Sequence, residues 1–229
     1  MRIKVLYEDS NILAIEKPSG ILVHPDKAGK VPTILDLFIK KYPKLEIVHR
    51  LDRETSGVLL LAKNQKAHEF LKKQFMNRDI KKTYVAIVDG WVKNDHGIIN
   101  KPIGRSPSDF RRRLAGRGAR GEMREAITEY KILKRISFPP DKGGLRGVES
   151  KFTYLELKPK TGRTHQIRVH MKFLNHPVVC DSLYNPKGFC PKGLNRLTLH
   201  AKSIEFKNLK DKVFKIESKL PKEIEKMIK

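Results

Sequence analysis

The sequence predicts an α+β fold in which a mixed, mostly antiparallel central sheet is flanked by helices and loops. Three observations favour this class. Short strand-like segments recur from the first residues to the last, helical periodicity is confined to a few short stretches, and neither a linker nor an internal repeat divides the 229 residues. A chain of this length is expected to form one domain, here residues 1–229.

The N-terminal part begins with strands. Residues 3–7 and 12–15 alternate around a turn and predict a hairpin. Thr33 then caps a short helix that must end near Tyr42, because the proline that follows disfavours helix at the residue before it. Residues 58–62 form a continuous apolar run, which predicts a buried central strand.

The middle of the chain alternates between helix and strand. Residues 65–76 place apolar side chains on one helical face, and residues 83–91 predict a strand. Further strands are predicted at residues 126–136 and 152–158, joined by a long irregular connection around residues 138–144.

The C-terminal part predicts a helix over residues 163–174, which stops before a proline. Strands follow at residues 197–206 and 213–216, and a short helix begins at Lys222. The order of these elements favours one sheet covered by helices.

The charge of the chain indicates its class of partner. Lys and Arg total 49 against 25 Asp and Glu, a formal net charge of +24, which excludes an acidic scaffold and favours an anionic partner. No apolar run approaches the roughly 20 residues that a membrane span requires, and the N-terminus lacks the apolar stretch of a secretory signal. We therefore expect a cytoplasmic protein without a membrane partner, and a monomer because no coiled-coil pattern is present.

Arginine and glycine concentrate in residues 101–124, where eight basic residues face only Asp109 and Glu122. This composition predicts a flexible loop that closes on phosphate, because guanidinium groups bind phosphate oxygens in pairs and glycine lets the backbone approach. A disordered surface loop is the alternative. A membrane-binding helix is disfavoured because the segment has almost no apolar face.

The two cysteines, Cys180 and Cys190, are too few for a disulfide framework, and a reducing compartment would keep them as thiols. They could be combined with His170 and His176 into a metal set, but this spacing matches no common zinc pattern. We expect neither a metal ion nor redox chemistry.

Residues 49–57 place Asp52 between Arg50 and Arg53, just before the most apolar strand. In one interpretation Asp52 is a turn residue whose charge the arginines neutralise. In the other it is a partly buried carboxylate that acts as nucleophile or base, because a nearby opposite charge favours the ionised form. Spacing alone leaves both interpretations open.

Residues 161–170 form a second polar cluster, which begins at a strand end and continues into a helix. Arg168 lies between apolar residues, so its side chain is expected to point inward and to need a carboxylate partner, since a guanidinium cannot lose its proton. Asp52 is the natural candidate. A phosphate-binding helix start at residues 162–164 is a compatible alternative.

Five ordered motifs make the sequence similar to the RluA family of RNA pseudouridine synthases over nearly its whole length. The motifs are residues 17–25, 49–57, 82–86, 162–168 and 199–201. The resemblance implies the fold described above, an isomerase activity on RNA, and no cofactor. A separate N-terminal RNA-binding domain, common in relatives, is expected to be absent because the first motif starts at Lys17.

The resemblance also implies roles for individual residues. Asp52 would be the catalytic aspartate, Tyr84 the ring that packs against the target uridine, and Arg168 the salt-bridge partner of Asp52. The apolar wall of the uridine pocket would fall near Leu197 or Leu199.

RNA is expected to be contacted by basic residues from three regions of the chain. Arg50 resembles the family arginine that enters the space left by the flipped nucleotide, and the arginine-rich segment would dock the RNA. The full expected set is Arg50, Arg53, Arg105, Arg111, Arg112, Arg113, Arg163 and His165.

The reaction that the family carries out fits this set of residues. Converting uridine to pseudouridine breaks the bond from N1 to C1′, turns the uracil and rejoins it through C5, so no redox cofactor is needed. A carboxylate could attack C1′ or C6, or remove the proton at C2′, and the sequence does not choose. The target base must first leave its stack, at a cost of roughly a few kcal/mol.

Structured RNA is the expected substrate, with ribosomal and transfer RNA both open. A non-catalytic RNA-binding or assembly protein is the main alternative, motivated by the net charge of +24. A metal-dependent nuclease is a third reading.

Overall fold

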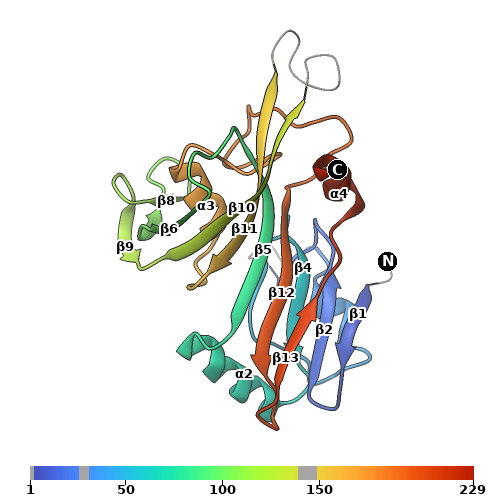
Figure 1. The fold of residues 1–229 in the computed structure, drawn as a ribbon. Helices are drawn as coiled ribbons and strands as arrows, with labels where there is room; N and C mark the ends of the chain where they lie inside the picture. Colours follow the sequence, from blue (N-terminus) through green and yellow to red (C-terminus); the bar gives the residue numbers. More distant parts are fainter. Residues whose placement is uncertain (1–2, 26–30, 139–148) are drawn as a thin grey trace. The chain divides into compact units, whose positions relative to one another are not determined.

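The computed structural model describes residues 3–25, 31–138 and 149–229. The chain divides into two compact units, residues 1–83 with 200–219 and residues 84–199 with 220–229 (Figure 1). Both units contain mostly antiparallel strands and few helices, which confirms the predicted α+β class. The single domain remains a prediction, and most of the connection expected at residues 138–144 lies outside the described residues.

The first unit is built on one sheet with the strand order β1-β2-β4-β12, in which β3 also pairs with β4 and β13 with β12. The strands are β1 (Lys4–Glu8), β2 (Ile12–Lys17), β3 (Glu46–Ile47), β4 (Ser56–Ala62), β12 (Leu199–Lys207) and β13 (Val213–Glu217). The pairing of β4 with β12 is parallel and the others are antiparallel, so the sheet is mixed.

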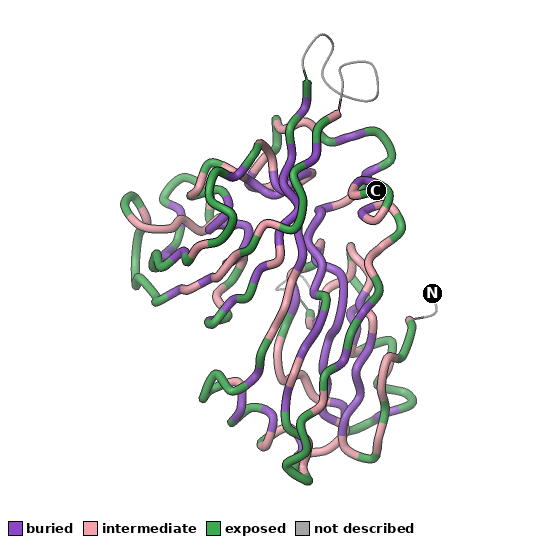
Figure 2. Tube along the Cα trace, in the orientation of Figure 1, coloured by how far each residue is buried: buried purple, intermediate pink, exposed green. Residues whose placement is uncertain are grey.

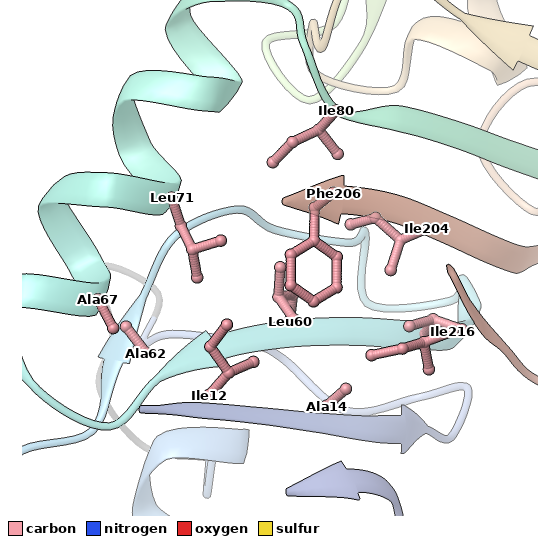
Figure 3. Close-up of a cluster of buried hydrophobic side chains, with 11 residues drawn as sticks. Ile12, Ala14, Leu60, Ala62, Ala67, Leu71, Ile80, Ile204, Phe206 and Ile216 are labelled. Carbon is pink, nitrogen blue, oxygen red and sulfur yellow. The ribbon is translucent and has the colours of Figure 1, made fainter. Parts of the chain in front are cut away.

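Strand β4 is buried at every residue, as its unbroken apolar run predicts (Figure 2). Helix α2 (Gln65–Asn77) follows it and covers one face of the sheet. Ala67 and Leu71 of this helix pack with Leu60 and Phe206 in a fully apolar cluster (Figure 3). Strand β4, which begins within the Asp52 motif at Ser56, is therefore part of the core of the first unit.

The ends of the two helices in this unit have identifiable causes. Thr33 caps α1 (Ile34–Phe38) through a capping box with Asp36, as the sequence predicts. Asn64 caps α2 by accepting from the backbone of Ala67, and Arg78 ends it in the left-handed conformation.

The second unit contains an antiparallel sheet with the strand order β5-β11-β10-β6. Its elements are β5 (Lys81–Asp89), β6 (His96–Asn100), β10 (Ile127–Phe138), β11 (Ser150–Pro159), α3 (Gln166–Phe173) and α4 (Lys222–Ile228). Helix α3 contributes Ile167 and Met171 to a cluster with Leu155 and Leu157 of β11, so one face of α3 is fixed against this sheet.

The arginine-rich segment is a separate three-stranded sheet, not the flexible loop that its composition predicted. Strand β7 (Ile103–Arg105) lies between β8 (Arg113–Ala115) and β9 (Arg120–Arg124). Gly116 and Gly118 have positive φ angles in the tight connection from β8 to β9. The glycines of this segment thus permit tight turns rather than disorder.

Cys180 and Cys190 form a disulfide, so the prediction that both stay thiols was wrong. The alternative metal set that used their sulfurs was wrong for the same reason. Within the described ranges, no three His, Cys, Asp or Glu side chains gather closely enough to hold a metal ion. None of the described helices is long and apolar enough to cross a membrane.

Candidate active site

Asp52 lies in the first unit, in the loop between β3 and β4, and is half buried. Its carbonyl oxygen accepts a hydrogen bond from the Thr55 backbone at 3.1 Å, which closes a tight turn. Asp52 is therefore a half-buried turn residue, and its role as nucleophile or base stays a prediction. Its loop is held in place by residues from two other motifs.

Lys17, the first residue of the motif at residues 17–25, holds this loop by hydrogen bonds. Its side chain is fully buried, and its ammonium donates to the carbonyl oxygens of Pro18, Ile21 and Arg53 at 2.9, 2.9 and 3.0 Å. A buried ammonium is tolerated only with such partners. The carbonyl group of Arg53, the residue after Asp52, is thus held by a buried side chain of the first unit.

The next residues of the first motif reinforce this arrangement. The Gly20 backbone donates to the carbonyl of Arg53 at 2.8 Å, and the Ser19 hydroxyl donates to the carbonyl of Glu54 at 2.6 Å. In return Arg53 donates through Nε to the carbonyl of Gly20 at 3.1 Å. The Arg53 guanidinium, expected to contact RNA, therefore also ties two motifs together.

The late motif holds the far end of the loop. Ser56 and His200 form a buried hydrogen bond of 2.8 Å between Oγ and Nδ1. Beside it, Gly57 has φ +114°, and a Cβ there would lie 2.1 Å from the carbonyl oxygen of Ala201. Only glycine allows β4 and β12 to approach this closely.

His49 is a structural residue of the same loop. Its Nε2 accepts a hydrogen bond from the Leu60 backbone at 2.9 Å, and its ring stacks on Phe75 at 4.9 Å. Burial, with a smaller effect from the charge of Lys82, lowers the pKa of His49 to about 3. Burial also lowers the pKa of Lys82 to about 8. The imidazole is neutral at pH 7, as its acceptor role requires.

Arg168 lies in the second unit on α3, and its side chain is 4% exposed, which confirms the inward orientation. Its Nε and Nη2 donate to the two carboxylate oxygens of Asp181 at 2.7 and 2.8 Å. Asp181 is itself 1% exposed, so this is a buried, two-point ion pair. A partnership with Asp52, a residue of the other unit, stays a prediction.

Asp181 is fixed by further hydrogen bonds. Its Oδ1 also accepts from the backbones of Leu183 and Tyr184, each at 2.9 Å. The Tyr184 ring lies under the Arg168 guanidinium, 5.1 Å from ring centre to Cζ. The disulfide from Cys180 to Cys190 closes the loop that carries Asp181 and Tyr184.

Tyr184 connects this pair to the arginine-rich sheet. Its hydroxyl oxygen accepts from the backbone of Arg113 in β8 at 2.9 Å, and it lies 2.9 Å from Nδ1 of His165. The backbone of His165 is left-handed and therefore not helical. Helix α3 begins after it, at Gln166, and not at the predicted residue 163. The motif histidine thus contacts the residue that supports Arg168.

The start of α3 is held by buried polar side chains. The Gln166 amide oxygen accepts from the Thr161 hydroxyl at 2.7 Å and from the Arg163 backbone at 3.0 Å, and its nitrogen donates to Thr128 at 3.0 Å. The His170 ring contacts the same Thr128 hydroxyl at 2.9 Å. These bonds satisfy the polar side chains at the buried start of α3.

Tyr84 lies on β5, opposite Leu157 of β11, and is half buried. It packs against the apolar cluster that contains Leu197 and Leu199, which are 2% and 3% exposed. The ring and the two leucines expected to line the uridine pocket therefore share one cluster. Their contact with a uridine is still a prediction.

Arginines form a row across the three-stranded sheet. Arg105 of β7 pairs in register with Arg113 of β8 and with Arg120 of β9. Like charges on directly opposite residues repel each other in a sheet. This row is consistent with the expected binding of phosphate.

Three of the other basic residues expected at the RNA have local contacts. Arg111 and Arg112 both pair with Asp109, at 2.8 and 3.5 Å. Arg163 donates through Nε to the carbonyl of Glu125 at 2.9 Å, and Arg50 is exposed.

Three residues of this arrangement are not apparent as site residues from the sequence. The sequence shows Lys17 only as part of a motif, and no pattern singles out Asp181 or Tyr184. A signal existed for Asp181, because a buried guanidinium needs a carboxylate and Asp181 follows the buried residues Val178 and Val179.

Comparisons with known proteins agree with these motifs. A sequence model of the family described as RNA pseudouridylate synthase matches residues 11–173. The uncharacterized RNA pseudouridine synthase YhcT of Bacillus subtilis (strain 168) is 37% identical over 207 residues, which cover 88% of this chain and 63% of that protein. Ribosomal large subunit pseudouridine synthase D of Borreliella burgdorferi is 36% identical over 233 residues, covering 96% of this chain and 66% of that protein.

Among solved structures, human RNA pseudouridylate synthase domain containing 4 is similar, with a TM-score of 0.73 and 27% identity. The similarity covers 96% of this chain and 90% of that one. This chain spans slightly less than two thirds of the length of the two bacterial relatives. The family match over most of the chain and the relatives above 30% identity show that the chain belongs to the RNA pseudouridylate synthase family.

Proposed function

We propose that this protein isomerises uridine to pseudouridine in structured RNA, with Asp52 as the catalytic carboxylate. The observation that carries the proposal is the fixation of the Asp52 loop by two other family motifs. Lys17 holds the carbonyl after Asp52, and His200 holds Ser56 at the far end. A surface turn would not need a fully buried ammonium to fix it, whereas a reacting carboxylate must be held in place.

The chemistry assigns one task to each residue. Asp52 acts at the ribose or the uracil while the N1–C1′ bond breaks and the C5–C1′ bond forms; C5 loses its proton and N1 gains one. Tyr84 stacks on the uracil, and Leu197 or Leu199 forms the apolar wall beside it. Arg168 places a positive charge next to the Asp52 carboxylate.

RNA binding is assigned to the arginines. Arg50 occupies the space of the flipped nucleotide, and the arginine row of β7 to β9 binds phosphates. Ribosomal RNA is our first candidate substrate, because one relative is named for the large ribosomal subunit. Transfer RNA is the second. We also propose that the protein acts in the cytoplasm as a monomer.

The test is the substitution Asp52→Asn, which keeps the shape of the side chain and removes its charge. The proposal expects no pseudouridine formation, measured as tritium release from RNA labelled at uracil C5, and RNA affinity within about twofold of the parent. Asp211→Asn, at an exposed turn residue, is the matched control and should keep full activity.

The other two functions predict different results. A non-catalytic RNA-binding protein releases no tritium even with Asp52 intact. A metal-dependent nuclease shortens the RNA and loses its activity in chelator. Full tritium release by Asp52→Asn would refute the assignment of Asp52.

A further inference from the structure

The turn between β7 and β8 displays an aromatic ring to solvent. Phe110 is 87% exposed and is the most exposed large hydrophobic side chain of the described residues. Arg111, Arg112 and Arg113 follow it directly. An apolar ring among cations has no role in a core and calls for an external partner.

The turn that carries Phe110 is preformed. The Arg112 backbone donates to the carbonyl of Asp109 at 2.9 Å, which closes a four-residue turn. The Asp109 carboxylate accepts from the Arg111 backbone at 2.9 Å and from the Arg111 guanidinium at 3.0 and 2.8 Å. These hydrogen bonds lower the pKa of Asp109 to about 2, so the turn keeps its bonds throughout the neutral range.

Arg113 fixes the turn from below. Its Nη1 donates to the carbonyls of Phe110 and Arg112 at 3.1 and 3.0 Å, while its backbone donates to the buried Tyr184. The Phe110 backbone is therefore tied, through one residue, to the core of the second unit. A ring held in this way loses little backbone entropy on binding.

The surroundings of the ring identify the kind of partner. A protein or lipid surface that covered Phe110 would have to desolvate the neighbouring guanidinium groups, which is costly without anionic partners. An RNA strand satisfies both needs, because an unpaired base offers a flat face to the ring and the adjacent phosphates accept from the arginines.

We propose that Phe110 stacks on an unpaired base of the RNA substrate, a base other than the target uridine, while Arg111 and Arg112 bind the neighbouring phosphates. The proposal rests on the proposed function for the identity of the substrate as RNA. It adds a requirement that this RNA be single-stranded or looped at the point of contact.

The first experiment is spectroscopic. The chain has one tryptophan, Trp91, so F110W in a Trp91→Phe background reports on this position alone. We expect saturable fluorescence quenching with a hairpin RNA that has an unpaired loop, and none with a blunt duplex RNA bound to the same extent. Equal quenching by both RNAs, or none by the hairpin, would overturn the proposal.

The second experiment separates stacking from apolar contact. Phe110→Ala and Phe110→Leu should both weaken binding to the hairpin roughly 5- to 100-fold, whereas Phe110→Tyr should keep parental affinity. The salt dependence should be unchanged in all three, because no charge is removed. Parental affinity in Phe110→Leu would overturn the proposal. Ile98→Ala, at another exposed apolar side chain, is the control and should have no effect.

The stacking and the proposed function can fail independently. If the protein makes no pseudouridine but its fluorescence is quenched only by the hairpin, the activity is refuted and the stacking is supported. If the protein makes pseudouridine and the Phe110→Ala variant binds the hairpin as tightly as the parent, the stacking is refuted and the activity stands.

Discussion

At the scale of single residues, the second unit contains a buried ion pair between Arg168 and Asp181. The Arg168 guanidinium donates to both carboxylate oxygens of Asp181 inside the second unit. The sequence predicts Asp52 as a carboxylate partner of Arg168, which stays a prediction, and it does not point to Asp181. The contact with Asp181 depends on how the chain packs, and spacing in the sequence does not reveal it.

The Asp181 carboxylate should be essential for stability. Asp181→Ala removes both acceptors of the Arg168 guanidinium in a buried site, and breaking such a pair costs about 3 to 5 kcal/mol. Urea unfolding would measure this loss. Asp95→Ala, which removes an exposed partner of Arg135, should cost at most about 1 kcal/mol and serves as the control. If both variants unfold alike, the buried pair contributes no more than a surface pair.

His49 should make the protein sensitive to acid. Its pKa is about 3 in the folded chain and near 6.5 when unfolded, so between these values the unfolded state binds more protons and stability falls as pH falls. From pH 6.5 to 5 the loss is at most about 2 kcal/mol. Urea unfolding at both pH values would measure it.

The matched variant for this prediction is His49→Gln. A glutamine oxygen can accept from the Leu60 backbone, as Nε2 of His49 does, but it does not titrate. The variant should lose less stability than the parent over the same pH range. Equal losses in the two proteins would show that other groups cause the acid sensitivity.

At the scale of elements, the sequence predicted what periodicity and caps determine. Helix α2 and strand β4 lie within a few residues of their predicted bounds, because an apolar helical face and an unbroken apolar run are visible in the sequence. Strands β7 and β8 have three residues each, too few to show alternation. Strand β8 is also held by the hydroxyl of Tyr184, which lies far away in the chain.

The arginine row of β7 to β9 should cost stability and supply RNA affinity. Arg105→Gln and Arg120→Gln each relieve repulsion between opposite like charges, so each should stabilise the free protein by a few tenths of a kcal/mol. Each should also weaken RNA binding and reduce the slope of log K against log salt by about 0.7 to 0.9.

The control for the row is Lys210→Gln, which removes an exposed cation from a turn of the first unit. Thermal unfolding and RNA titrations at several salt concentrations would make the comparison. If all three variants reduce the slope equally, general charge binds the RNA and the row has no special part.

At the scale of the whole molecule, the assignment of Asp52, Tyr84 and Arg168 came from motif resemblance, and composition could not have provided it. The structure adds the reasons for the motifs. The Lys17 motif and the His200 motif hold the Asp52 loop, and the arginine motif builds the buried polar start of α3. The residues that give this support are far apart in the sequence and meet only in the fold.

The net charge of +24 should make the free protein and its RNA complex respond to salt in opposite directions. Excess positive charge destabilises a compact chain by self-repulsion, and added salt screens it, so the Tm of the free protein should rise between 50 and 300 mM NaCl. Bound RNA stabilises the folded state by mass action, and this gain should shrink over the same range because salt weakens phosphate contacts. The two Tm curves should therefore converge, as thermal scans with and without hairpin RNA would show. Equimolar sucrose, which screens no charge, is the control; parallel curves in salt would mean that charge is not what holds the RNA.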